Sequence, residues 1–328
     1  MNRPNTALHR FAVFTAAATF VLIFAGGLVT STGSALAVPD WPLSFGKFFP
    51  KLEGGVLYEH GHRMIAATVT LLTLVLMVWV FRAEHRIWVK RLAAAAFGLI
   101  VVQAVLGGLT VLFLLPLPIA VAHAATAQAF LCLVVALAIF TNPRWESAGR
   151  ETPVDSGRSP LAILAAVTTG AIYLQILLGA LIRHMGAGLA IPDFPLSFGR
   201  LVPPLDSQFV AVNFAHRCGA VVVTALVIFT VVRTLGTHRD QAWLRRPALG
   251  LLVLLSAQLC LGAITVWSGK AVVPTTAHVA LGAGVLAMSL MLTLRAFRIL
   301  RAAPARDQVR ELSPTPPHRR IADDRVIA

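Results

Sequence analysis

The sequence predicts an all-α integral membrane protein with eight transmembrane helices, arranged as two tandem four-helix bundles. The first observation is the composition: of 328 residues, 57% are hydrophobic and 13% are charged, whereas a soluble domain carries about 25% charged residues. The second is that the apolar residues form eight long blocks, each near the roughly 20 residues that a membrane-spanning helix needs. The third is that the two halves of the chain repeat one another. Together these features exclude a cytosolic globular protein and a disordered chain.

In chain order, the blocks predict helices over 11–30, 57–81, 93–114, 119–141, 160–182, 209–234, 247–267 and 274–297. The first block has no small-residue cleavage site followed by a polar segment, so we expect a retained helix and not a signal peptide. An even number of spans places both termini on the same side of the membrane. After Arg298 the chain is rich in Arg and Pro, and we expect a flexible cytoplasmic tail of no readable function.

The net charge of +14 orients these helices and does not indicate a nucleic-acid partner. With the N-terminus placed inside, only seven of the 28 Lys and Arg residues fall on the outer side, and they are Lys47, Lys51, Arg63, Arg183, Arg200, Arg217 and Lys270. The cytoplasmic segments of membrane proteins carry an excess of positive charge of this kind. We therefore expect an integral protein of a bacterial plasma membrane with both termini in the cytoplasm.

An internal duplication is the strongest organisational feature. Residues 27–50 (GLVTSTGSALAVPDWPLSFGKFFP) and residues 180–203 (ALIRHMGAGLAIPDFPLSFGRLVP) match at an offset of 153 residues. The register then drifts by one or two residues, and it pairs His62 with His216 and His123 with His278. Because each half begins and ends on the cytoplasmic side, the repeats are parallel and not inverted. Inverted repeats are common in transporters, so this arrangement argues against a transporter.

The duplication divides the chain into four parts. We expect an N-terminal four-helix half over 1–145, a cytoplasmic linker over 146–159, a C-terminal four-helix half over 160–298 and the tail over 299–328. Each half is expected to carry one site at a similar depth near the outer face, related by a pseudo-twofold axis along the membrane normal.

Four of the ten histidines, His62, His123, His216 and His278, stand near the outer end of a predicted helix. A polar ring inside a membrane bundle is costly and usually marks a function, and four rings in a repeated pattern favour binding over a purely structural role. The remaining histidines predict less: we expect His9, His85, His238 and His318 in cytoplasmic segments and His60 and His184 in interfacial loops.

Two histidines in each half suit a haem iron better than other metals. A zinc site would need further Cys or carboxylate ligands, and copper would more often recruit Cys or Met. The three cysteines, Cys132, Cys218 and Cys260, all lie within apolar blocks, and they indicate neither a disulfide framework nor a CxxC site. Two histidines from facing helices of a bundle can hold one haem iron axially.

The halves differ beside these histidines. Glu59 precedes His62 by three residues and shares its helix face, whereas the matching position in the C-terminal half is Asn213. A carboxylate can carry protons or position water, and an amide cannot titrate; a surface acid at the membrane edge is the alternative for Glu59. Arg63 and Arg217 follow their histidines and could pair with haem propionates or reach the headgroups.

The outer loops repeat the pattern Pro-Asp-aromatic-Pro-Leu-Ser-Phe-Gly, centred on Trp41 and Phe194. Their aromatic residues suit the membrane interface, and the loops could act either as lids over the two sites or as plain interfacial anchors. We expect the glycines of the adjoining helices, Gly26, Gly27, Gly107, Gly108, Gly179 and Gly262, to permit close helix contact.

These motifs together resemble the haem A synthase family of cytochrome oxidase biogenesis. The resemblance covers residues 10–297 and rests on the GGLV…TGS…PDWP entry to the first outer loop, the Glu59-x-x-His62-Arg63 motif, the LGGLTV run over 106–111, and the duplicated His123 and His278. It implies that the N-terminal half holds the substrate haem O, with His62 and His123 at its iron and Glu59 essential to the chemistry. It implies one cofactor haem b in the C-terminal half, held through His216 and His278.

The resemblance also implies the reaction and the partners. A ring methyl of haem O becomes the formyl group of haem A, with oxygen from water. The expected partners are haem O synthase, cytochrome oxidase assembly factors and an electron acceptor in the membrane. The sequence departs from the family in two places: the first outer loop lacks the cysteine pair that some members carry, and Thr30 stands where many members have Arg, although Arg183 is present at the repeat position. A non-catalytic electron-transfer cytochrome with two bis-histidine haems is the alternative reading, which Glu59 disfavours.

Overall fold

A computed structural model describes residues 5–148, 154–155 and 160–302 of the chain. Its long helices are α1 (Thr6–Ser31), α2 (Gly55–Ala83), α3 (Ile87–Leu112), α4 (Leu117–Phe140), α6 (Leu161–His184), α7 (Gln208–Thr237), α8 (Ala242–Trp267) and α9 (Val272–Ile299). All eight are long and apolar enough to cross a membrane. The prediction of an all-α protein with eight membrane-spanning helices is therefore confirmed.

Each of these helices runs past its predicted apolar block at one end at least, and α1, α2, α7 and α9 do so at both ends. In α1, for example, the side chain of Asn5 accepts a hydrogen bond from the N–H of Leu8 at 2.9 Å and starts the helix at Thr6. The last turn of α3 ends earlier than predicted, at Leu112, because Leu114 and Leu115 have positive φ angles. Hydropathy marks the part of a helix that lies in lipid, whereas caps and turns set where the helix begins and ends.

Helix α8 starts five residues before the proline at which the sequence placed its beginning. Pro247 has no N–H, so the carbonyl oxygen of Trp243, four residues earlier, lacks its usual helical donor. The guanidinium of Arg295 in α9 donates to that oxygen at 3.1 Å. The helix therefore continues through Pro247 because a neighbouring helix supplies the missing hydrogen bond.

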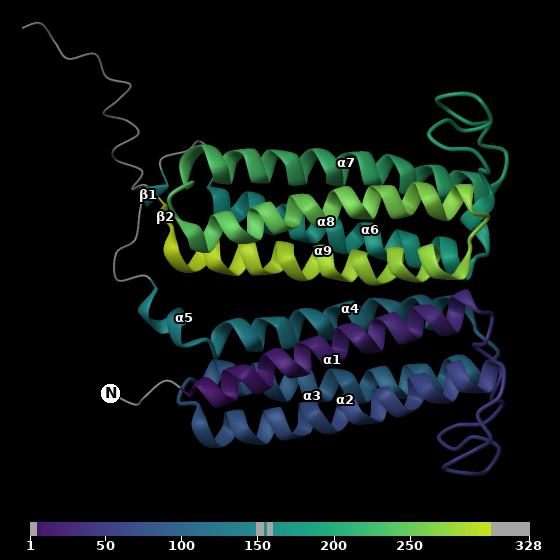
Figure 1. Cartoon of the computed structure of the whole chain (residues 1–328), viewed down its shortest axis with the longest axis horizontal. Helices are drawn as coiled ribbons and strands as arrows, with labels where there is room; N and C mark the ends of the chain where they lie inside the picture. The colour runs from purple at the N-terminus through teal and green to yellow at the C-terminus, as the bar shows by residue number, and fades with distance from the viewer. Residues whose placement is uncertain (1–4, 149–153, 156–159, 303–328) are drawn as a thin grey trace, which may run out of the picture.

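Each half of the chain forms a four-helix bundle (Figure 1). In the first, α1 contacts α2, α2 contacts α3, α3 contacts α4 and α4 contacts α1; in the second, α6, α7, α8 and α9 make the same circuit. The two bundles meet through α1 and α4 on one side and α6 and α9 on the other. This pairing is what a twofold arrangement of the two halves would give.

Short elements join the bundles at the cytoplasmic ends assigned by the charge count. The helix α5 (Pro143–Ser147) follows α4, and β1 (Val154–Asp155) pairs in parallel with β2 (Arg301–Ala302) after α9. This pairing lies within the stretches that the sequence assigned to the linker and the tail. Most of the predicted tail lies outside the described residues.

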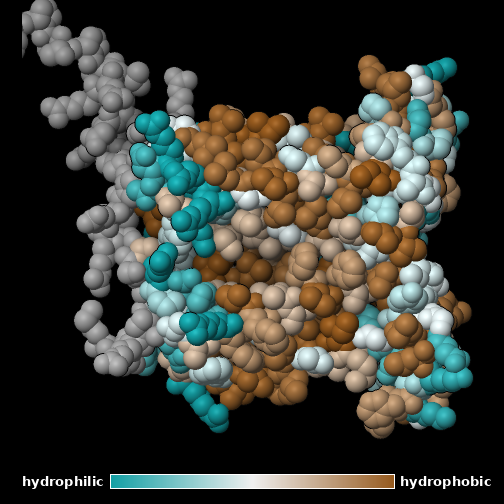
Figure 2. Space-filling view, in the orientation of Figure 1, coloured by the Kyte–Doolittle hydropathy of each residue, from teal (hydrophilic) through white to brown (hydrophobic). Residues whose placement is uncertain are grey.

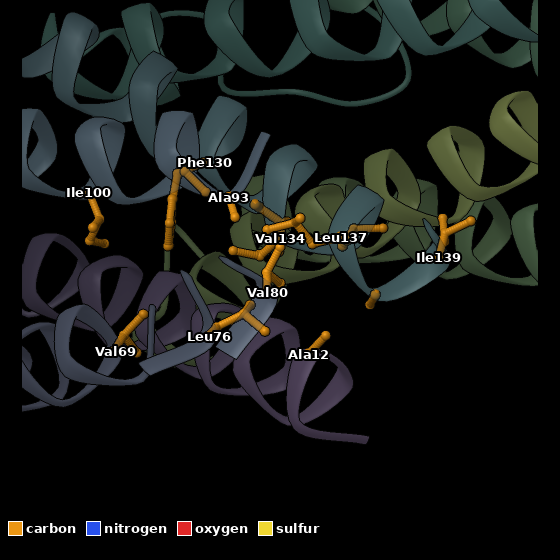
Figure 3. Close-up of a cluster of buried hydrophobic side chains, with 14 of the residues drawn as sticks. Ala12, Val69, Leu76, Val80, Ala93, Ile100, Phe130, Val134, Leu137 and Ile139 are labelled. Atoms are coloured by element: carbon orange, nitrogen blue, oxygen red, sulfur yellow. The ribbon is translucent and has the colours of Figure 1, made fainter. Parts of the chain in front are cut away.

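The outer surface of the bundles is apolar around its middle and polar at both ends (Figure 2). Inside the N-terminal bundle, a cluster of fully buried side chains fills the space between the helices (Figure 3); it includes Val69, Leu76, Ile100, Phe130 and Leu137, and it extends to Ala283 of α9. Since lipid provides no hydrophobic drive between helices, close packing of this kind holds the bundle together.

Aromatic rings join the two bundles at the end opposite the long loops. Phe140 of α4 lies edge-on to Trp145 of α5 at 4.8 Å, and Trp145 lies 6.2 Å from Trp243 of α8. Arg298 of α9 stacks over the Trp145 ring and donates to its carbonyl oxygen at 2.8 Å. The packing of the halves against one another is thus fixed at this end by ring and cation–π contacts.

Candidate functional site

The four histidines predicted from the repeat lie on α2, α4, α7 and α9 and form two pairs. His62 lies close enough to His123 for a charge on one ring to act on the other, and His278 lies within the same reach of His216. The first pair belongs to the N-terminal bundle and the second to the C-terminal bundle. Each pair therefore brings two imidazole rings from two non-adjacent helices toward one another inside a bundle.

A glycine on the preceding helix stands against each of these rings. A Cβ atom added to the glycine would lie 3.0 to 3.1 Å from the Cε1 atom of the histidine in all four cases, and the pairs are Gly26 with His62, Gly107 with His123, Gly179 with His216 and Gly262 with His278. A contact this short is closer than side chains normally make. The sequence suggested only that these glycines allow helices to approach, and the structure shows that they leave room for the imidazole edges.

The donor set fits a haem better than a bare metal ion. Among the described residues, no group of three or more His, Cys, Asp and Glu side chains could hold a metal. A porphyrin supplies four nitrogen ligands to its iron, so the protein needs to supply only two more. Two facing histidines whose rings fit against glycines match that requirement in each bundle.

A glutamine lies at the Nε2 atom of one histidine in each pair. The side-chain nitrogen of Gln103 in α3 is 3.3 Å from Nε2 of His123, and that of Gln258 in α8 is 3.5 Å from Nε2 of His278. The side-chain oxygen of Gln103 accepts a hydrogen bond from Thr126. The repeat matches these glutamines to one another, and their role beside the histidines is visible only in the folded chain.

Two outer loops with the same internal structure follow α1 and α6 and project from the same end of the molecule (Figure 1). In the first loop, the Asp40 carboxylate accepts hydrogen bonds from the N–H groups of Gly46 (2.8 Å) and Phe45 (2.7 Å). Asp193 makes the same two bonds in the second loop. The amide of Gly46, followed by that of Phe45, holds the pKa of Asp40 below its usual value of 3.8. The spacing from Asp to Phe-Gly, which the two repeats share, thus gives both loops the same closed turn.

Arg63 and Arg217 fasten these loops to the bundles. The Arg63 guanidinium donates to the carbonyl oxygens of Asp40 (2.7 Å) and Leu43 (2.8 Å). Arg217 donates in the same way to Asp193 (2.8 Å) and to Leu196 (2.9 Å). Contacts of either arginine with a haem propionate stay a prediction, and loop fastening is a role that the sequence did not reveal.

Glu59 is buried, with 4% of its surface exposed, so it is not a surface acid at the membrane edge. One carboxylate oxygen accepts the N–H of Val38 at 2.9 Å, and the other pairs with Arg63 at 2.7 Å. Asn213 stands at the same place in the C-terminal half, where it accepts from Arg217 at 3.1 Å and donates to the carbonyl of Ala187 at 2.9 Å. The two halves share the contact with the arginine and differ in the backbone partner and in the charge at this position.

The first loop also contacts α3 next to the N-terminal site. A Cβ atom at Gly108 of α3 would lie 2.5 to 2.8 Å from atoms of the Trp41 ring, so the indole rests directly on the helix beside Gly107. In the C-terminal half, Phe194 packs edge-on against Trp267 at 6.0 Å. Both loops thus contact a helix of their own bundle, and a role as lids over the two sites stays a prediction.

Arg183 connects the two bundles near the loop end and was not predicted to do so. Its guanidinium, at the end of α6, donates to the carbonyl oxygen of Gly27 at 2.6 Å and to the hydroxyl of Ser31 at 2.8 Å, both in α1. His60 and His184 were expected in interfacial loops, and that expectation is wrong for both, because they lie within α2 and α6. His60 is buried and bonds to Ser44 at 2.8 Å.

Comparison with known proteins is consistent with this geometry. Residues 57–290 match the COX15-CtaA family, described as cytochrome oxidase assembly protein. The chain is 35% identical to "Heme A synthase" of Symbiobacterium thermophilum over 273 residues, which is 79% of this chain and 85% of that protein. It is 29% identical to "Heme A synthase" of Shouchella clausii, covering 90% of this chain and 97% of that protein, and 29% identical to the protein of the same name from Geobacillus kaustophilus, covering 89% and 93%.

Proposed function

Because this chain belongs to the COX15-CtaA family of cytochrome oxidase assembly proteins, we propose that it is a membrane oxidoreductase that converts haem O to haem A. The observation that carries this proposal is the set of two histidine pairs, each ring seated against a glycine. Such pairs suit two haems, and the carboxylate of Glu59 beside only one of them supports a division into a reacting site and an electron-transfer site.

The N-terminal half is the substrate site in this proposal, with His62 and His123 at the iron of haem O. Oxidation of a ring methyl to a formyl group removes electrons and protons and adds an oxygen atom from water. Glu59 positions that water and accepts protons, because a carboxylate in a partly dry site can do both. Its second oxygen stays paired with Arg63, which orients the carboxylate.

The C-terminal half is the cofactor site, where His216 and His278 hold one haem b. Haem b when bound supplies one-electron transfer between the substrate site and an acceptor. Asn213 keeps the contact with the following arginine that Glu59 makes in the other half and brings no titratable group. The asymmetry supports catalysis in one half and disfavours the alternative of a pure electron-transfer cytochrome.

We further propose that the halves over 1–145 and 160–298 are functional units joined by the linker over 146–159, with both sites near the outer face and both termini in the cytoplasm. Haem O synthase, other assembly factors of cytochrome oxidase and an electron acceptor in the membrane are the expected partners.

Extraction of haems from cells with and without this protein tests the proposal. We expect haem A only where the protein is produced together with a source of haem O, and haem O alone in its absence. In the purified protein, His216→Ala or His278→Ala should remove one low-spin haem signal. Two bound haems with no haem A in the cells would favour the electron-transfer cytochrome.

A further inference from the structure

We infer that Gln175 and Gly219 are positioning residues that hold the ring of His216, and that they make the C-terminal haem a retained group while the N-terminal haem can exchange. The inference rests on the proposed function, in which the first site must release a product and the second must keep a cofactor. It is carried by the surroundings of the Nδ1 atoms of His62 and His216, which differ between the halves.

Both C-terminal histidines have a partner at Nδ1. The side-chain nitrogen of Gln175 lies 3.0 Å from Nδ1 of His216 and 2.8 Å from the carbonyl oxygen of the same residue. For His278, the carbonyl oxygen of Gln258 lies 3.2 Å from Nδ1. Both rings are thus fixed by a contact on the side away from Nε2.

The counterpart of His216 in the N-terminal half, His62, has no such partner. Its Nδ1 atom is buried and makes no hydrogen bond with any described residue, whereas His123 interacts with the backbone of Gln103, as His278 does with that of Gln258. A buried polar nitrogen without a partner costs free energy. The His62 ring is therefore less firmly fixed in rotation and tautomer than the His216 ring.

The repeat explains how the difference is built. The repeat matches Gln175 to Leu22 at the offset of 153 residues. It matches Gly219 to Ile65 at the offset of 154 residues. A Cβ atom at Gly219 would lie only 2.2 Å from the side-chain oxygen of Gln175. The amide of Gln175 therefore fits only because residue 219 is glycine, and the N-terminal half replaces both members of the pair with aliphatic side chains.

The chemistry of iron ligation gives this difference a consequence. When Nε2 of a histidine binds a metal, Nδ1 keeps the ring proton and needs an acceptor, which fixes the ring and makes it a stronger ligand. A carboxamide offers both a donor end and an acceptor end, so rotation of the Gln175 amide places its oxygen at Nδ1 in exchange for its hydrogen bond to the His216 carbonyl oxygen. Loss of such a partner typically weakens metal binding about 10- to 100-fold.

Gln175→Leu tests the inference, because it installs the residue of the N-terminal half. In membranes, we expect the C-terminal haem to be lost on dilution or competition with a haem scavenger about tenfold more readily than from the unmodified protein. We also expect its reduction potential to rise, because a weaker axial donor stabilises ferric iron less. A tenfold change in that preference corresponds to about 59 mV for a one-electron couple.

Gly219→Ala is the second variant, because its Cβ would displace the Gln175 amide without changing it. Gly236→Ala is the matched control on the same helix, since a Cβ there meets nothing within 4 Å. The same potential and haem retention in Gln175→Leu and Gly219→Ala as in the control would overturn the inference.

The reciprocal change is made in the N-terminal half with Leu22→Gln combined with Ile65→Gly. We expect slower exchange of the haem bound by His62 and a lower yield of released haem A. Haem A yield from the unmodified protein is measured in parallel. If the unmodified protein made no haem A, the proposed function would be wrong. A shifted reduction potential of the C-terminal haem in Gln175→Leu would even then show that Gln175 acts on that haem. An unchanged exchange rate in the double variant would contradict the role of this pair in haem release.

Discussion

Gly107 of α3 lies directly against the imidazole of His123 on α4, so that a Cβ at residue 107 would come within 3.0 Å of the ring carbon Cε1. Three further glycine–histidine pairs repeat this contact at the corresponding places. A glycine in a helix interior costs about 1 kcal/mol relative to alanine. Because a glycine stands beside each of the four histidine rings despite this cost, we infer that the rings need the space that a side chain would fill.

We predict that Gly107→Ala displaces the His123 ring and weakens haem binding in the N-terminal half by about tenfold or more, in the range typical for a disturbed ligand environment. The measurement is the haem content and the low-spin absorption of the purified protein. Gly98→Ala is the control on the same helix, because a Cβ there has no neighbour within 4 Å. Equal haem content in both variants would show that the contact is incidental.

We predict that Glu59→Gln leaves haem binding in both halves intact and stops haem A production, with haem O or a partly oxidised intermediate accumulating. The reason is that a carboxamide cannot accept the protons released by the reaction. Extraction of the pigments from cells that express the variant measures this outcome.

Glu59 also fastens the first loop, so the test needs a variant that loosens a loop without removing a carboxylate. Asn213→Asp does so in the C-terminal half, because aspartate cannot donate to the carbonyl of Ala187 as Asn213 does. We expect this control to continue making haem A. A normal yield from Glu59→Gln would leave Glu59 as a loop anchor alone and would favour the electron-transfer cytochrome.

We predict that the first outer loop stays closed from pH 8 down to about pH 4 and opens at lower pH. The hydrogen bonds from Gly46 and Phe45 lower the pKa of Asp40 below 3.8. A group whose pKa is lowered by folding contributes stability above its unfolded pKa, and that contribution is lost as the pH falls through the folded value. Hydrogen exchange of the Phe45 and Gly46 amides, corrected for the intrinsic rate, should show it.

Asp40→Asn provides the matching change at neutral pH. It removes the charge from the acceptor, and hydrogen bonds to charged groups are stronger than neutral ones, so the same amides should exchange faster at pH 7. Loss of protection of these amides between pH 6 and pH 4 in the unmodified protein would contradict the assignment.

We predict that the two long loops face outward. Lys51 and Arg239 have side chains that are 82% and 79% exposed, and they lie at opposite ends of the bundles. In a background without the three native cysteines, a membrane-impermeant thiol reagent applied to intact cells should label Lys51→Cys and not Arg239→Cys. The opposite pattern would place the haem sites at the cytoplasmic face.

The sequence by itself determined the eight helices and the four histidines. Backbone groups in lipid must be satisfied within one segment, which allows only a helix for each long apolar block, and the duplication singled out His62, His123, His216 and His278. The predicted lengths were shorter than the observed helices because capping residues such as Asn5 and contacts such as that of Arg295 with Trp243 lie outside the hydropathy pattern.

Only the tertiary structure decided what each of these side chains touches. The burial of Glu59 between Val38 and Arg63 and the seating of Gln175 beside Gly219 depend on the rotation of each helix about its axis and on the distance between helices. Hydropathy constrains neither quantity inside a membrane, where every helix is apolar on most of its surface. Packing and the few buried hydrogen bonds set both, and they made two halves with matching sequences unequal around their histidines.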